Sequence, residues 1–258
     1  MLKLYDNPFS PFARKVRLVL AYKGLPFERI DALALDRHDD LVRANPRAEV
    51  PALDDDGFIV VNSSHIVAYL EDRTPSPPVL PGDPKQRAAA RSWERMADSL
   101  LDAVIHDISI WGWPTHHRED RPPEGLYEAG RSDLLGFMGT MESALGGEGF
   151  FCGELSVADF AIFPHVTALK PLGILFDAAA HPKLAAWFRR MRSLEVVQDD
   201  LEYVKAMALE KFGSAAMPYE SEKIVWRGDR IEWLFARGFH AWWMVELEAG
   251  RAIVPSWL

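Results

Sequence analysis

The chain has 258 residues, of which 48% are hydrophobic, so it can bury the core of one large domain or of two smaller ones. Its formal net charge of -9 argues against a nucleic-acid-binding protein and against attachment to an anionic membrane, because both need a basic face. The single cysteine, Cys152, cannot form an internal disulfide, and the sequence shows neither a signal-peptide pattern nor an apolar run of about 20 residues. We therefore expect a cytoplasmic protein without a nucleic-acid or membrane partner.

The first 73 residues predict alternating strands and helices. Serine directly before proline is a common helix start, so a helix is expected from Pro11 to the glycine at position 24. Asp55, Asp56 and Gly57 form the turn of a predicted hairpin. The expected strands cover residues 2–5, 26–32, 50–53 and 58–61, and further helices are expected at 37–43 and 62–70. This order predicts a parallel pair joined by a crossover helix plus an antiparallel edge, which is a thioredoxin-like layout.

The second part of the chain predicts helices only. Residues 74–85 carry five prolines and are expected to link a domain at 1–73 to an all-helical domain at 86–258. One helix is expected from Pro84 to about Trp113, and others at 124–145, from Ser156 through Leu169, and after Pro182. Ser156 and Asp159 have the spacing of a capping box. The tail from 215 to 258 is too aromatic for disorder and is expected to pack on the body of the protein.

Four segments together resemble the glutathione transferase superfamily over about residues 1–195. They are SPFARKVRLVLAYKG, NP followed by VPAL, NSSHIVAYLED, and LSVADF within the helical half. The resemblance implies an α/β thioredoxin-like domain that binds glutathione and an all-α domain that supplies the pocket for a second substrate. It also implies a homodimer and a glutathione S-transferase activity of the detoxification type, with glutathione as co-substrate and a small, apolar electrophile as the second substrate.

In this family a Ser, Cys or Tyr near the end of the first strand activates the glutathione thiol. The resemblance assigns this role to Ser10, with Tyr5 as the alternative. A free thiol has a pKa of about 8.5, and a hydroxyl donor at the positive end of a helix favours the thiolate. Ser10 is also expected to cap its helix, and the two roles are compatible because a hydroxyl both accepts and donates. Serine instead of cysteine at position 10 favours an attacking thiolate over disulfide reduction.

The same resemblance assigns the remaining glutathione contacts. It implies a cis peptide between Val50 and Pro51, with the Val50 backbone paired to the cysteinyl part of glutathione, and it gives the γ-glutamyl group to Asn62 and Ser63. Asn62 stands where Glu or Gln is usual, so its contact is either lost or made through water. Ser63 either binds a carboxylate at the helix start or only caps the helix. Three side chains before Val50 are candidates for the glycyl carboxylate: Arg37, His38 and Arg47.

Several interpretations stay open at this stage. A non-catalytic binding protein of the same fold is one alternative, and a glutathione-dependent thiol reductase or isomerase is another. Trp111 and Trp113 are either lining residues of the second-substrate pocket or ordinary core. Cys152 is expected to be a buried, inert thiol. No metal is expected, because three histidines have no evident ligand partners: His106, His116 and His117.

Overall fold

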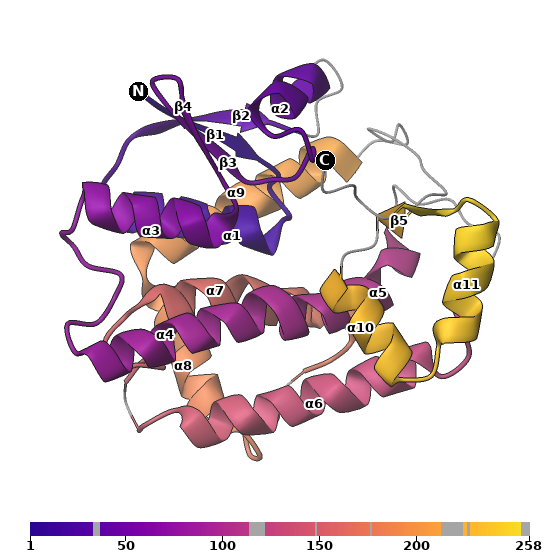
Figure 1. The fold of residues 1–258 in the computed structure, drawn as a ribbon. Coiled ribbons are helices and arrows are strands. Elements are labelled where there is room, and N and C mark those ends of the chain that lie inside the picture. Colours follow the sequence, from indigo (N-terminus) through magenta and orange to yellow (C-terminus); the bar gives the residue numbers. More distant parts are fainter. Residues whose placement is uncertain are drawn as a thin grey trace.

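The computed structural model describes residues 1–32, 37–113, 122–147, 149–175, 177–212, 224–225 and 228–253 (Figure 1). Its N-terminal part is a mixed sheet with the strand order β2-β1-β3-β4. Strand β1 runs parallel to β2 and antiparallel to β3, and β3 forms an antiparallel hairpin with β4, as the sequence predicts. The strands are β1 (Leu2–Asp6), β2 (Phe27–Asp31), β3 (Ala52–Asp55) and β4 (Phe58–Val61).

Helices cover this sheet and bury its apolar side chains. Helices α1 (Pro11–Tyr22) and α3 (Ser63–Arg73) lie side by side on one side of the sheet, and α2 (His38–Ala44) lies at the other side (Figure 1). Leu4 of β1 and Leu53 of β3 are fully buried together with Leu20 of α1 and Ile66 of α3. The thioredoxin-like layout expected from the alternating pattern is therefore confirmed.

The helical part begins with the long segment predicted up to about Trp113, but this segment is not one regular α-helix. A π-helical turn, Ala97–Leu101, separates α4 from α5, and a 3₁₀ turn, Ile110–Gly112, ends the segment. No residue in ADSLL breaks a helix, so the sequence carries no signal for the wider turn. The helices up to residue 212 are α4 (Pro84–Met96), α5 (Asp102–Ser109), α6 (Leu126–Ala144), α7 (Val157–Ala168), α8 (Pro182–Ser193) and α9 (Glu195–Phe212).

Helix α7 forms the centre of the helical part and connects it to the sheet domain. Every residue from Val157 to Val166 is buried, and α7 packs against both α1 and α4. The predicted capping box is confirmed: the Asp159 carboxylate accepts from the backbone nitrogen of Ser156 at 3.0 Å. It also accepts from Trp187 Nε1 at 2.8 Å, so this carboxylate joins α7 to α8.

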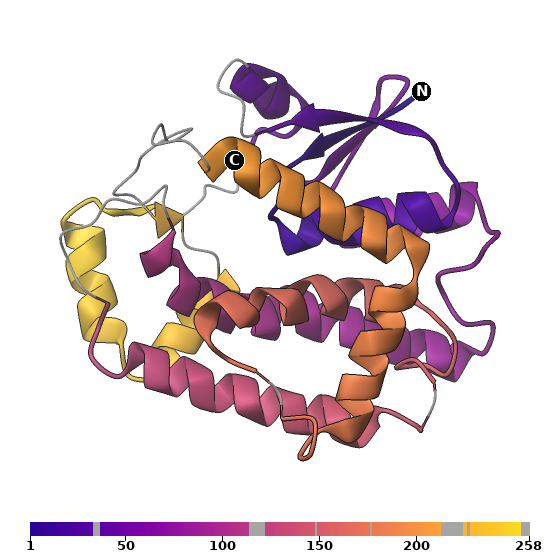
Figure 2. The ribbon, with the colours of Figure 1, turned by 180° about the vertical axis from the view of Figure 1, so that it is seen from behind.

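Two elements of the C-terminal region differ from the sequence-based expectation. The pattern does not predict α9, which lies along α1 on the side seen in Figure 2. A short parallel pair, β5 (Ile224–Val225) with β6 (Ala252–Ile253), departs from the expected all-helical domain. Strands of two residues are too short to show the alternation on which strand prediction depends.

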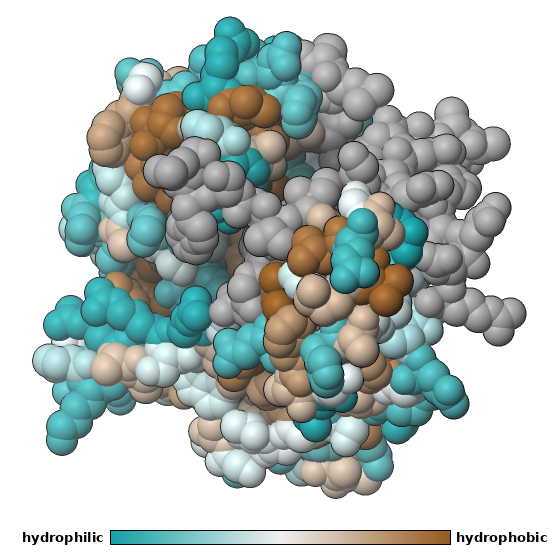
Figure 3. All heavy atoms as spheres, turned by 45° about the vertical axis from the view of Figure 1, so that its right-hand side comes forward, coloured by the Kyte–Doolittle hydropathy of each residue, from teal (hydrophilic) through white to brown (hydrophobic). Residues whose placement is uncertain are grey.

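The described part of the tail packs on the helical body, as expected. Helix α10 (Gly228–Ala236) packs against α5, and α11 (His240–Glu248) follows it. Leu234 is fully buried, and Trp233 donates to Asp133 of α6 at 2.8 Å. Figure 3 brings this side forward and shows apolar surface on it, where α11 exposes Met244 and Val245. Within the described ranges, no helix has the length and apolar character needed to cross a bilayer.

Candidate functional site

Ser10 occupies the N-cap of α1, as the sequence predicts. Its backbone is extended (φ -67°, ψ 122°), and its hydroxyl oxygen accepts from the backbone nitrogen of Ala13 at 3.3 Å. The Ser10 nitrogen donates to the Asn7 carbonyl at 3.1 Å, which closes a tight turn between β1 and α1. The half-buried hydroxyl thus lies at the positive end of a twelve-residue helix and keeps its own proton for donation.

Tyr5, the alternative to Ser10, lies inside β1 opposite Ala52. Successive side chains of a strand point to opposite faces of its sheet. Leu4 belongs to the core that α1 and α3 cover, so Tyr5 projects toward the other face. The fold therefore directs Tyr5 away from the side of the sheet on which α1 lies.

The peptide between Val50 and Pro51 is cis, as the family resemblance implied. Pairing between β3 and β1 begins at Ala52, so the backbone of Val50 lies just beyond the hydrogen-bonded ladder. The loop before it is held by Asn45, which is buried, donates to the Glu49 carbonyl at 2.8 Å and accepts from the nitrogen of residue 47 at 3.2 Å. An Asn just before an extended segment is a turn-forming signal that the sequence offers for this role.

Asn62 and Ser63 begin α3, as predicted. Asn62 is the N-cap, with φ 73°, a backbone conformation that Asn adopts more readily than most residues with a side chain. Its Oδ1 accepts from the Ser64 nitrogen at 3.1 Å, which leaves its amide nitrogen as a donor. Ser63 is the first residue of the helix and is buried.

Four of the predicted residues line one cavity of about 470 Å³: Val50, Pro51, Asn62 and Ser63. This volume is in the usual range for small-molecule sites. Ser10 and Tyr5 are not among the residues that line it, although Phe12, two residues after Ser10, is. The candidates for the glycyl carboxylate, Arg37, His38 and Arg47, are not among them either. Arg37 pairs with Asp40 at 3.2 Å, and Arg47 pairs at 3.0 Å with Glu49, which does line the cavity.

The wall opposite α3 is charged and was missed at the level of sequence. Lys15 of α1 is fully buried; its Nζ donates to Glu94 Oε1 at 2.9 Å and also to Asp98 Oδ2. Ser64 donates to the same Asp98 oxygen at 3.0 Å, whereas Asp98 Oδ1 makes no hydrogen bond to the part of the chain described. Glu94 and Asp98 both line the cavity, beside Arg91. The signal was the segment FARKVRLVL, which places three cations in a helix expected to pack on a sheet.

The candidate residues for a second-substrate pocket contact one another and the tail. Trp111 donates to the Asp107 carbonyl at 3.0 Å, and its ring lies 5.7 Å from that of Trp242. Trp113 is 38% exposed, with its ring 4.9 Å from that of His106. The contact between Trp111 and Trp242 joins the end of the long helical segment to α11.

The sequence also offers a thiol, Cys152, and histidines that could bind a metal. Cys152 is buried, and burial raises the pKa of its thiol, as expected for an inert cysteine. Among the residues that the structure describes, no three His, Cys, Asp or Glu side chains gather as metal ligands. His116 and His117 lie outside the described residues.

Comparison with known proteins identifies clear relatives. Two family models match the chain: the glutathione S-transferase N-terminal domain over residues 4–78 and the C-terminal domain over residues 124–190. The chain is 33% identical over 221 residues to the probable glutathione S-transferase GSTU6 of Oryza sativa subsp. japonica, covering 78% of this chain and 90% of that protein. It is 27% identical over 206 residues to the maleylacetoacetate isomerase of Pseudomonas aeruginosa, covering 70% and 92%. A glutathione S-transferase from Methylobacterium radiotolerans, solved in complex with glutathione sulfonate, is 29% identical with a TM-score of 0.66, covering 77% and 93%.

Proposed function

The chain belongs to the glutathione S-transferase family, and from this premise we propose that it binds glutathione in the 470 Å³ cavity and activates the thiol for attack on a small, apolar electrophile. The observation that carries the proposal is the meeting of the cis Val50-Pro51 segment and the Asn62-Ser63 helix start in one cavity.

The charges around the cavity support recognition of the γ-glutamyl group. This group ends in an ammonium and a carboxylate on the same carbon. The first amides of α3 and the Ser63 hydroxyl can hold the carboxylate, because a helix start favours an anion. Asp98, which lines the cavity, supplies a carboxylate that can attract the ammonium. The amide nitrogen of Asn62 is suited to donate to the carboxylate, since its oxygen already caps the helix.

The geometry of the turn before α1 supports Ser10 as the residue that activates the thiol. Phe12, in the first turn of α1, lines the same cavity as Val50, so the sulfur of a glutathione whose cysteinyl part pairs with the Val50 backbone would lie toward the start of α1. A hydroxyl donor and the helix dipole there stabilise the thiolate. Lowering the thiol pKa by about two units corresponds to roughly 2.7 kcal/mol in favour of the anion. Tyr5 remains the alternative, and its place on the opposite face of the sheet favours Ser10.

The step shared by the possible reactions is attack of the glutathione sulfur on an electrophilic carbon of the second substrate. Conjugation, dehalogenation, isomerisation and ether cleavage all begin in this way. We assign the second-substrate pocket to the end of the long helical segment and to the aromatic tail, with Trp111 and Trp113 as lining residues. Which of the four reactions follows depends on that pocket and not on the fold.

We further propose that the protein acts as a homodimer in the cytoplasm. The edge strand β4 supports an association, since it exposes Phe58, Ile59 and Val61, with Phe58 60% exposed. Light scattering coupled to gel filtration is expected to give twice the chain mass of 29.1 kDa. A mass of one chain at micromolar concentration contradicts the dimer without affecting the glutathione site.

The experiment that tests the proposed function is glutathione calorimetry combined with a pH titration of the bound thiolate absorbance. The wild type is compared with Ser10→Ala, Tyr5→Phe and the control Ser92→Ala, whose hydroxyl lies on the exposed side of α4 and donates to the Ala88 carbonyl. We expect the bound thiol to titrate about two units below 8.5 in the wild type and near 8.5 only in Ser10→Ala. A normal shift in Ser10→Ala together with its loss in Tyr5→Phe moves the role to Tyr5. Absence of binding by the wild type favours the non-catalytic alternative.

A further inference from the structure

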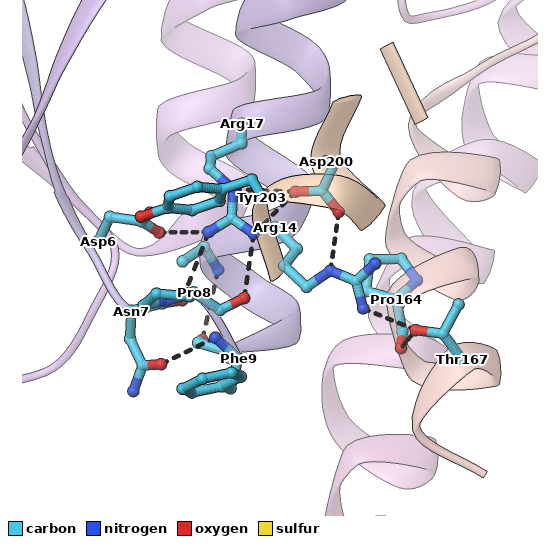
Figure 4. Close-up of polar contacts among 12 residues, drawn as sticks. Asp6, Asn7, Pro8, Phe9, Arg14, Arg17, Pro164, Thr167, Asp200 and Tyr203 are labelled. Atoms are coloured by element: carbon cyan, nitrogen blue, oxygen red, sulfur yellow. Dashed lines mark hydrogen bonds and ion pairs between the residues drawn. The ribbon is translucent and has the colours of Figure 1, made fainter. Parts of the chain in front are cut away.

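One arginine of the helix that follows Ser10 holds the turn in which Ser10 lies. Arg17 of α1 donates from Nη2 to the Pro8 carbonyl at 3.1 Å and from Nη1 to the Asn7 carbonyl at 3.4 Å (Figure 4). The same Asn7 carbonyl accepts from the Ser10 nitrogen at 3.1 Å. The position of the Ser10 backbone therefore depends on carbonyls that the Arg17 guanidinium holds.

Two buried carboxylates orient Arg17. Asp6, at the end of β1, accepts from Nη1 at 2.6 Å, and Asp200, from α9, accepts from Nε at 2.9 Å and from Nη2 at 2.7 Å. The three side chains are 2%, 0% and 4% exposed. A planar guanidinium held at its three nitrogens has one orientation only, and this fixes the direction of its bonds to the two carbonyls.

Helix α9 contacts the same turn at further points. The Tyr203 hydroxyl donates to Asp6 at 3.3 Å, and its ring lies 5.0 Å from the Arg17 guanidinium. Burial raises the pKa of Tyr203 to about 12, so this hydroxyl stays protonated and remains a donor. The ring of Phe212 lies 5.2 Å from that of Phe9, which directly precedes Ser10. Helix α9 thus contacts the turn and the residues that hold it through an ion pair, a hydrogen bond and a ring contact.

We propose that Arg17 and Asp200 are positioning residues for Ser10, through which helix α9 determines how strongly the Ser10 hydroxyl stabilises the glutathione thiolate. This inference rests on the proposed function. Burial of two ion pairs is a weak source of stability, because desolvation offsets the attraction and apolar side chains of similar size often do as well. What a buried guanidinium supplies and an apolar side chain does not is directed bonding to two carbonyls, three and two residues before Ser10.

The test compares Asp200→Asn with Asp133→Asn. Asp133 serves as the control, because its carboxylate also accepts from side chains of another helical segment, Trp233 and Arg237, each at 2.8 Å, and it lies on α6, away from the turn. The first readout is amide hydrogen exchange of Asn7, Phe9 and Ser10 without glutathione. We expect faster exchange of these amides in Asp200→Asn and an unchanged rate in Asp133→Asn. Unchanged exchange in Asp200→Asn overturns the inference whether or not glutathione binds.

The second readout is the titration of the bound glutathione thiol in the same full-length variants. We expect Asp200→Asn to raise the thiol pKa by about half a unit or more, which is about a threefold lower ratio of thiolate to thiol, and Asp133→Asn to leave it unchanged. A thiol pKa that rises in Ser10→Ala but not in Asp200→Asn overturns the inference and leaves the proposed function intact. Absence of glutathione binding in the wild type overturns both.

A milder variant keeps the test decisive if Asp200→Asn does not fold. Arg17→Lys retains the positive charge between the two carboxylates but loses the planar fork that reaches both carbonyls. We expect it to fold, to bind glutathione with an affinity within about threefold of wild type, and to raise the thiol pKa as Asp200→Asn does. A wild-type thiol pKa in folded Arg17→Lys contradicts the positioning role.

Discussion

The hydrogen-bonded carboxylate at the start of α7 makes the stability of the protein depend on pH in a direction opposite to that of most carboxylates. Asp159 is fully buried and accepts four hydrogen bonds: from the nitrogens of Phe151 and Ser156, from the Ser156 hydroxyl and from Trp187 Nε1. No cation is among these donors. Burial raises the pKa of Asp159 from 3.8 to about 6, and the four hydrogen bonds oppose this only in part.

The perturbation that isolates this carboxylate is Asp159→Asn. Because its pKa is higher in the folded than in the unfolded state, the folded protein holds the proton more tightly. Its stabilising contribution is complete below about pH 3.8 and is lost as pH rises through about 6. The difference of 2.2 units, at about 1.4 kcal/mol per unit, gives a loss on the order of 3 kcal/mol. Asparagine does not titrate, and its amide NH₂ group faces the two Ser156 donors, which then lose their acceptor. The variant is therefore less stable than the wild type at every pH.

The assay is urea unfolding followed by circular dichroism at fixed protein concentration from pH 4 to pH 8. The stability gap between wild type and Asp159→Asn is expected to be widest at pH 4 and to narrow by about 2–2.5 kcal/mol by pH 7. Taking the difference between the two proteins removes the contributions of the other titrating groups. A gap that stays constant or widens with pH refutes the reasoning, because it means that the four donors keep the carboxylate ionised in the folded state.

Three further predictions follow from the buried side chains. Cys152 is expected to react with an alkylating reagent at pH 7 at least tenfold more slowly in the folded than in the urea-unfolded protein, and equal rates contradict its burial. Truncation after Phe212 removes Arg230, which donates to buried Asp107 at 2.6 Å, and is expected to lower the unfolding free energy by about 3–5 kcal/mol; unchanged stability means that the tail does not buttress α5. Lys15→Met leaves Glu94 and Asp98 without their shared cation beside the cavity and is expected to weaken glutathione binding at least tenfold, as measured by calorimetry. An affinity equal to that of the wild type would mean that these carboxylates take no part in binding glutathione.

Local patterns in the sequence predict the sheet domain well, because its elements carry local signals. Ser10-Pro11 predicts the start of α1, and the Asp56-Gly57 turn predicts the hairpin of β3 and β4. The cis bond before Pro51 has no such signal and came from the family resemblance alone. The same resemblance ended near residue 195, which is why α9 was not predicted although its residues permit a helix.

The charged contacts around the site were not predictable for a different reason. Arg14 and Arg17 lie on a helix whose pattern was assessed by its apolar residues, and their shared partner Asp200 lies more than 180 residues further along the chain. Nothing in the local sequence of either partner indicates such a pairing. The π-helical turn is not predictable from the sequence either, since helix-forming residues are compatible with both the α-helical and the π-helical hydrogen-bond pattern.

The pairing of α1 with Asp200 also has a consequence for the order in which the molecule acquires its structure during synthesis. The sheet and α1 leave the ribosome first, but the guanidiniums of Arg14 and Arg17 gain their common counterion only after α9 has been made. Until then, Arg17 has Asp6 as its carboxylate partner, and Arg14 lacks the carboxylate with which it pairs in the complete fold. The contacts that complete the N-terminal part therefore form only after most of the chain has been made, and an isolated 1–73 fragment lacks the carboxylate that Arg14 and Arg17 share.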